Sequence, residues 1–193
     1  MKKTALLILL GLIITGSYAQ ITSFGIKVGA NLATLTNNDN FETKFGVNFG
    51  AVADIELSEV LSWQPEILYS AQGYDGTFNN ENVKAKIDYF IIPMILDYEF
   101  ANNLSLQAGP QFGFNIRAER ELGTHEPQRL NVRDLDLSAV FGLQYFLDSN
   151  FFVQARYALG LNEVVLNENN KNSVFSFSVG FFVDRIAIIT VIY

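Results

Sequence analysis

Few side chains in this sequence have the type and spacing that catalysis requires. His125, in the segment ELGTHEPQ, is the only histidine, and the sequence has no cysteine. A catalytic histidine needs a nucleophile held at hydrogen-bond distance. No serine occurs in the Gly-x-Ser-x-Gly pattern of a nucleophile elbow. We interpret His125 as a surface loop residue and predict that the protein is not an enzyme and has no catalytic residue.

Metal and cofactor sites find as little support. The segments NNDN at 37–40 and NENNKN at 167–172 are rich in oxygen ligands, but neither has the ligand spacing of an EF-hand. We therefore predict no metal and no cofactor. The remaining candidates are charged and amide side chains inside long apolar segments, and their roles depend on the elements that position them.

Polar and apolar residues alternate with a period of two along eight segments. In FGVNFGAVADIEL, every odd position from 45 to 57 is apolar. Such alternation is typical of β-strands with one apolar face. The pattern occurs in segments 24–32, 45–57, 61–71, 90–100, 104–118, 135–147, 151–161 and 175–183. The sequence therefore predicts eight strands.

The apolar face of these strands excludes charge. It comprises 50 positions, of which two are proline and 48 are aliphatic or aromatic, although 17% of the chain is charged. A lysine or arginine at mid-bilayer costs a membrane barrel about 2–4 kcal/mol. The segments are also as long as the roughly 9–11 residues that a tilted membrane strand needs. We predict an all-β fold, an eight-stranded antiparallel up-and-down transmembrane β-barrel with its apolar face toward lipid.

A soluble lipocalin-like barrel, with the apolar face inside, is the alternative fold. A barrel of eight strands has little interior volume, and the apolar face is rich in Phe, Leu and Tyr. This composition favours the membrane barrel, and cell fractionation separates the two.

The opposite face supplies polar side chains to the barrel interior. The segments LSWQ, LSLQ and FFVQ each place a glutamine fourth after a short polar break, which predicts three glutamines at one level. Glu66 and Arg156 are expected at similar height, and Arg117 is expected to face Asp136. The predicted interior polar network comprises Lys27, Gln64, Glu66, Gln107, Arg117, Asp136, Gln154 and Arg156. Because buried ions must be paired, a structural polar plug is the main interpretation, and a functional relay is the alternative.

The connections between the segments differ in length. The short ones are 58–60, 101–103 and 148–150, and the long ones are 33–44, 72–86, 119–133 and 162–172. Short periplasmic turns and longer extracellular loops are the usual pattern of outer-membrane barrels. Beside the short turns lies a predicted aromatic girdle of Trp63, Tyr98, Phe100, Tyr145 and Phe151.

The first 19 residues have the layout of a cleaved secretory signal peptide. Lys2 and Lys3 precede an apolar run, and Ser17-Tyr18-Ala19 provides a small-x-small cleavage site. The barrel domain is then expected to cover residues 20–193. Acidic residues outnumber basic ones by 20 to 13 in the whole chain, which argues against nucleic acid as a partner.

Several segments resemble the PorT-type outer-membrane β-barrel family of Gram-negative bacteria. They are FGIKVGANLATL, LSWQPEILYSAQG, DYFIIPMILDYEF, LSLQAGPQFGF and FFVQARYALGL, and the resemblance covers about residues 22–182. It implies a non-enzymatic protein of the outer membrane, and the best-known member of the family assists protein secretion. One departure is the tail at 184–193, which either extends the last strand or forms an altered C-terminus.

We expect a structural or protein-interaction role in the cell envelope, including an association with secretion. The expected partners are outer-membrane lipid and other envelope proteins, and the protein is expected to be a monomer. A small passive channel is the second hypothesis, and conductance measurements separate it from the first. An envelope enzyme is the third, and it would depend on His125.

Overall fold

The computed structural model describes residues 22–36, 41–78, 81–123, 125–165 and 169–186. The predicted signal peptide at 1–19 and residues 187–193 of the tail lie outside this part of the chain.

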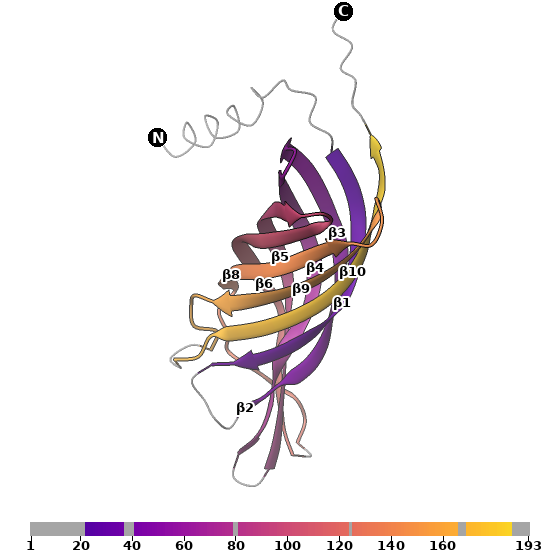
Figure 1. Cartoon of the computed structure of the whole chain (residues 1–193). Coiled ribbons are helices and arrows are strands. Elements are labelled where there is room, and N and C mark those ends of the chain that lie inside the picture. Colours follow the sequence, from indigo (N-terminus) through magenta and orange to yellow (C-terminus); the bar gives the residue numbers. More distant parts are fainter. Residues whose placement is uncertain (1–21, 37–40, 79–80, 124, 166–168, 187–193) are drawn as a thin grey trace, which may run out of the picture.

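Eight long antiparallel strands close into a barrel (Figure 1). They are β1 (Thr22–Leu35), β3 (Lys44–Ser58), β4 (Leu61–Phe78), β5 (Glu81–Ala101), β6 (Leu104–Leu122), β8 (Leu135–Phe146), β9 (Phe151–Gly160) and β10 (Asn172–Ile186). Each pairs with the next in chain order, and β1 pairs with β10 to close the ring. Two short strands, β2 (Phe41–Glu42) and β7 (Gln128–Arg129), pair with β4 and β6. The predicted eight-stranded up-and-down barrel is confirmed.

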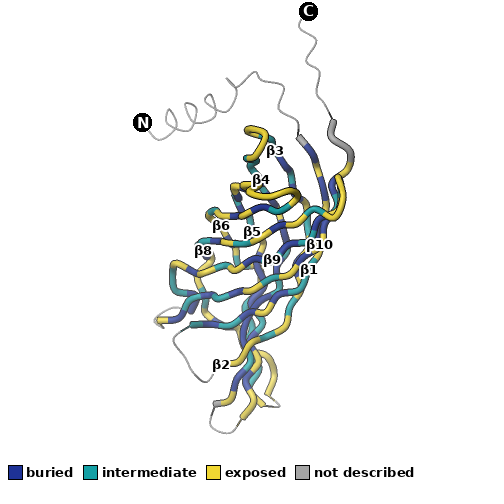
Figure 2. Tube along the Cα trace, viewed as in Figure 1, coloured by how far each residue is buried: buried dark blue, intermediate teal, exposed yellow. Residues whose placement is uncertain are grey.

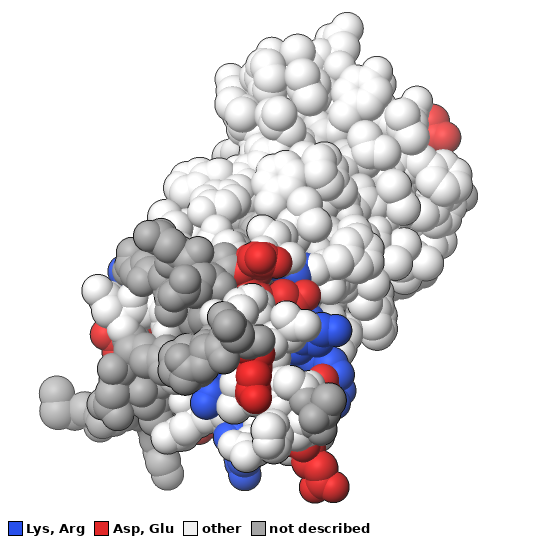
Figure 3. Space-filling model, turned by 90° about the horizontal axis from the view of Figure 1, so that it is seen from below, with Lys and Arg blue, Asp and Glu red and all other residues white. Residues whose placement is uncertain are grey.

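The apolar face of the barrel points outward. Ile26 and Phe45 are 69% and 67% exposed, whereas Lys27 between such positions is buried. Figure 2 shows this alternation of exposed and buried residues along the strands. The space-filling view shows an uncharged belt and a gathering of charged side chains at one end (Figure 3). A lipocalin-like arrangement would place the apolar face inside, so that alternative is wrong.

Short turns lie at one end of the barrel, where the described ends of β1 and β10 also lie (Figure 1). The β5–β6 turn contains Asn103 with a φ of 64°, a left-handed conformation that asparagine tolerates. In the β8–β9 turn, the Asp148 carboxylate accepts hydrogen bonds from the backbone N–H groups of Asn150 and Phe151, at 2.8 and 2.7 Å. These bonds hold the pKa of Asp148 below its usual value because they stabilise the charged carboxylate, and the bond from Phe151 has the larger effect.

The segment 72–86 is not the long loop that the sequence predicts. Strands β4 and β5 continue through it, with Tyr74 opposite Ala85 and Phe78 opposite Glu81. Glycine is common in turns, but Gly73 lies within strand β4 with a φ of 126°. A Cβ at this position would lie 2.1 Å from the Ala85 carbonyl oxygen. The hairpin therefore projects beyond the rest of the barrel at the long-loop end (Figure 1).

A β-bulge in β6 reverses the phase of that strand. Tyr89 pairs with Asn115 and Asp88 pairs with Arg117, so Ile116 is the additional residue. The Asn115 side-chain amide donates to the carbonyl oxygens of Asp88 and Arg117, at 3.3 and 3.0 Å. Ile116 and Arg117 are both exposed, and Ala118 packs on buried apolar residues although the sequence pattern assigns it to the outer face.

The expectation that Arg117 faces Asp136 inside the barrel is therefore wrong. Arg117 pairs with Glu119 outside, at 2.7 Å. Asp136 is buried opposite Gly113, and it accepts hydrogen bonds from Asn172 and Ser138. The bulge separates the two residues because it moves Arg117 to the other face of the strand.

Candidate functional site: the interior of the barrel

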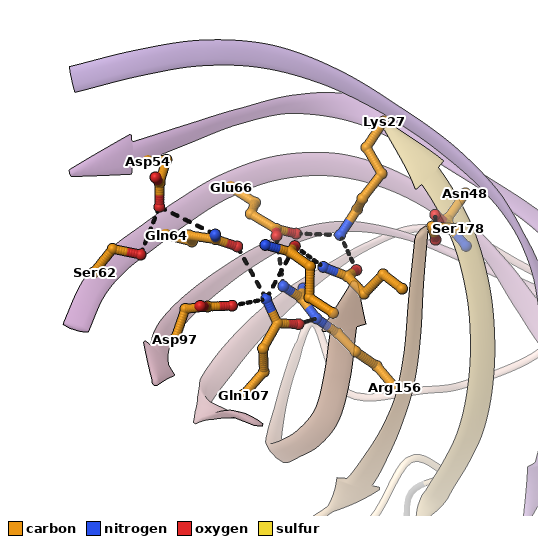
Figure 4. A network of polar contacts seen from close by, with 12 residues as sticks. Lys27, Asn48, Asp54, Ser62, Gln64, Glu66, Asp97, Gln107, Arg156 and Ser178 are labelled. Carbon is orange, nitrogen blue, oxygen red and sulfur yellow. Dashed lines mark hydrogen bonds and ion pairs between the residues drawn. The ribbon is translucent and has the colours of Figure 1, made fainter. Parts of the chain in front are cut away.

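Glu66 of β4 lies at the centre of a buried ionic cluster (Figure 4). Its Oε2 is 2.6 Å from Lys27 Nζ of β1, and its Oε1 is 2.8 Å from Arg156 Nη2 of β9. The exposed fractions of the Glu66, Lys27 and Arg156 side chains are 0%, 3% and 5%. Ions this far from solvent persist only when paired, so one carboxylate neutralises part of the charge of two cations.

Glutamines extend this cluster across the barrel. Gln154 accepts a hydrogen bond from Lys27 at 2.9 Å, and Gln107 accepts one from Arg156 Nε at 2.8 Å. Gln107 Nε2 also lies within 3.1 Å of acceptors on Gln64, Gln144 and Asp97. Gln64 in turn donates to Asp54. The repeated glutamines thus connect β4, β6 and β9 through one network, as Figure 4 shows.

A second polar layer lies nearer the long-loop end. Asn31 donates to Ser70 at 3.0 Å and accepts from Asn48 at 2.7 Å, and Ser178 of β10 donates to Asn48. Lys27, Gln72 and residues of this layer line a cavity of about 30 Å³, which is large enough to hold a water molecule. The Gln72 side-chain oxygen has no hydrogen-bond partner among the described residues.

Apolar side chains close the interior at both ends. At the short-turn end, Val52, Phe152 and Phe182 form a buried cluster against Phe146, with the Phe152 and Phe182 ring centroids 5.0 Å apart. Gly180 leaves space for the Phe152 ring, because a Cβ there would lie 2.1 Å from the ring. At the long-loop end, a larger apolar cluster comprises Leu35, Leu68, Tyr74, Val83, Ala85, Ile87, Tyr89, Ile91, Leu130, Val164 and Val165.

Residues between the long strands belong to the larger apolar cluster at the long-loop end, among them Leu130, Val164 and Val165. Val132 and Val165 form an isolated β-bridge, and the Arg133 N–H donates to the Val164 carbonyl. Leu130 is anchored by a backbone hydrogen bond to Ala118. The interior thus consists of an aromatic layer, an ionic and amide layer, and an apolar cap, and these layers fill it.

The structure brings together six of the eight residues expected inside the barrel. Lys27, Gln64, Glu66, Gln107, Gln154 and Arg156 share one network, Asp136 is buried apart from it, and Arg117 lies outside. The predicted network did not include Asp97 and Gln144, although both lie at inward positions of the alternating pattern. The prediction also missed the two apolar clusters, because some of their residues occupy positions of the polar phase and others lie in the predicted connections.

The predicted girdle residues lie beside the short turns. Tyr98, Phe100, Tyr145 and Phe151 are 44–50% exposed on the outer face, and Trp63 is half-buried there. His125 is exposed, and its Nδ1 lies 2.9 Å from the Leu122 carbonyl oxygen. Within the described residues, no group of three His, Cys, Asp or Glu side chains has the arrangement of a metal site. The same part of the chain has no helix with the length and hydropathy of a membrane span.

A family model matches most of the chain. The model described as "Outer membrane protein beta-barrel domain" aligns with residues 18–166. No curated protein matches the sequence.

Solved structures show the same fold. The structure of Neisserial surface protein A superimposes with a TM-score of 0.57 at 18% identity, covering 83% of this chain and 97% of that chain. The attachment invasion locus protein Ail of Yersinia pestis gives a TM-score of 0.54 at 14% identity, covering 84% of this chain and 99% of that chain. At these identities the similarity concerns the fold alone.

Proposed function

Because the chain belongs to the outer membrane protein beta-barrel domain family, we propose that this integral outer-membrane protein is a non-conducting, non-enzymatic barrel that acts by contacting other envelope proteins. Within that family we propose the PorT type, with a role associated with secretion, on the segments that resemble it. The signal peptide is proposed to be cleaved after Ala19. The barrel is proposed to be monomeric, with the long-loop end outside the cell and the short turns in the periplasm.

The filled interior is the observation that supports a non-conducting role. Side chains from opposite walls meet at Glu66, and apolar clusters close both ends. Eight strands enclose a space that side chains fill. A polar solute would have to disrupt the paired ions to pass, which is costly because these ions are nearly excluded from solvent.

The projecting hairpin supports a role in protein contacts. Strands β4, β5 and β6 extend beyond the apolar belt, and the outer face there carries paired charges such as Lys86 and Glu121, 3.0 Å apart. A hydrogen-bonded sheet loses less conformational entropy on binding a partner than a loop without regular structure does.

Two experiments test this proposal. Planar-bilayer recordings of the purified barrel should show no stable conductance, and ohmic steps of uniform size would favour the passive channel. Photo-crosslinkers placed at Lys84 of the hairpin and at Glu59 of a short turn should trap protein neighbours in intact cells. Failure of both positions to yield any protein adduct would contradict a role in protein contacts.

A further inference from the structure

A groove lies on the outside of the barrel where β6 leaves the apolar belt. Residues 115–119 of β6 form one wall and residues 126–134 form the other, and the groove has a volume of about 1000 Å³. Phe114 and Leu135, which pair with each other and are exposed, lie directly below it on the apolar belt. The groove therefore borders the apolar outer surface of the barrel, at the level where charged side chains begin.

The bulge in β6 places an apolar and a cationic side chain next to each other in this groove. Ile116 is 58% exposed and continues the belt, and the Arg117 guanidinium begins the charged surface above it. An unbroken strand would have directed Arg117 into the barrel. A bulge that redirects one side chain is a common feature of binding sites. The adjacent side chains of Ile116 and Arg117 match a ligand that has an apolar part and an anionic part.

A second arginine lies on the same face. Arg129 of β7 lies directly across from Glu119 in the strand register, and Glu119 is hydrogen-bonded to Arg117. Arg117, Glu119 and Arg129 all line the groove. Figure 3 shows basic and acidic side chains gathered together at this charged end of the molecule. Arginine binds phosphate through two parallel N–H groups, and a phosphate group can therefore replace Glu119 as the partner of Arg117.

The groove favours a lipid over a soluble anion. Glu119, Glu126 and Asp134 also line it, so its carboxylates outnumber its two arginines and weaken the binding of any phosphate group, free or on a lipid. A lipid headgroup is held at this height by its own acyl chains, which gives it a high effective concentration. Chains running over Ile116 and Phe114 add apolar contact that a soluble anion lacks.

We propose that this groove binds the phosphate-bearing headgroup of a lipid in the leaflet at the long-loop end, with the phosphate between Arg117 and Arg129. The acyl chains lie along Ile116, Phe114 and Leu135. The site goes beyond the proposed role in protein contacts, because it concerns the lipid that surrounds one sector of the barrel.

The test uses a single cysteine at Leu135, because the natural chain has none. A fluorophore at Leu135→Cys is placed in nanodiscs of phosphatidylcholine and phosphatidylglycerol, with bromine on the chains of one lipid at a time. We expect phosphatidylglycerol to be enriched near the label. The ratio of the fluorescence quenching by the two brominated lipids measures this enrichment. In Arg117→Gln/Arg129→Gln the enrichment should fall by about fivefold for each arginine removed, from roughly 1 kcal/mol per basic residue at a membrane surface.

The matched control is Lys84→Gln/Lys171→Gln, which removes the same charge away from the groove and should retain the enrichment. Circular dichroism establishes that each variant is folded. Equal loss in both double variants would assign the effect to net charge and overturn the proposal, as would absence of enrichment in the natural sequence. Displacement of phosphatidylglycerol by inorganic phosphate would overturn the assignment to a lipid.

Discussion

Replacing Glu66 by glutamine removes the carboxylate that contacts both buried cations. Lys27 and Arg156 would lose their shared carboxylate partner while nearly excluded from solvent, and glutamine offers them one neutral oxygen. Breaking a buried ion pair by removing one partner costs about 3–5 kcal/mol. We expect Glu66→Gln to lower the free energy of unfolding by that amount.

A second substitution separates lost charge balance from lost packing. Lys27→Met/Glu66→Gln removes one cation together with the anion, so the net charge of the cluster returns to its natural value. This double variant should be more stable than Glu66→Gln, although it lacks one further hydrogen bond. The expected coupling between Lys27 and Glu66 is about 1–3 kcal/mol, within the range of residues in direct contact.

Urea unfolding in lipid vesicles measures these free energies. Trp63 is the only tryptophan and lies near the short-turn end of β4, so its fluorescence reports the transition without a label. A loss below about 1 kcal/mol for Glu66→Gln would mean that water reaches the cluster, because only hydrated ions tolerate loss of a partner at that cost. A double variant less stable than Glu66→Gln would refute the argument from charge balance.

Three further predictions concern the aromatic cluster at the short-turn end and the β8–β9 turn. Phe152→Ala should lower the free energy of unfolding by about 3–5 kcal/mol in a urea titration, as for other buried aromatic side chains; no change would indicate that the aromatic cluster is not packed. Gly180→Ala should cost about 1–3 kcal/mol because its Cβ meets the Phe152 ring, and Phe152→Leu should reduce that cost. Asp148→Ala should remove a contribution to stability that exists above about pH 4, the usual carboxyl pKa, and disappears as pH falls through the lower folded-state pKa. Comparing the urea midpoints of both proteins at pH 7 and during acidification checks this, and equal midpoints at every pH would contradict it.

The period-two alternation was sufficient to predict the fold. A one-residue slip would transfer every side chain to the other face, so eight segments with uncharged apolar phases could only form a two-faced barrel. Gln64, Gln107 and Gln154 are each fourth in their segments, and this shared position predicted that they lie at the same height along the barrel axis. Each of these inferences depends on regular strands, and each agrees with the structure where the strands are regular.

The departures occur where strands are irregular or where small residues suit both faces. Ala118 is small enough for either face of the strand. The apolar alternation in the sequence therefore continued past Ile116, although the bulge there exchanges the inward and outward positions of β6. Gly73 and Gly76 suggested a loop where the hairpin continues. The apolar cap was not predictable because Leu130 and Val164 lie in segments without periodicity and meet only after the barrel has closed.

The orientation of the apolar face is tested most directly by spin labels on β10. Single cysteines at Phe175, Ser176, Phe177, Ser178 and Val179 would carry nitroxides in the reconstituted barrel, and collision with dissolved oxygen would report contact with lipid. Accessibility should be high at 175, 177 and 179 and low at 176 and 178, because the structure exposes the first three and turns the other two inward. The reverse pattern, or equal accessibility at all five positions, would contradict a barrel with its apolar face toward lipid.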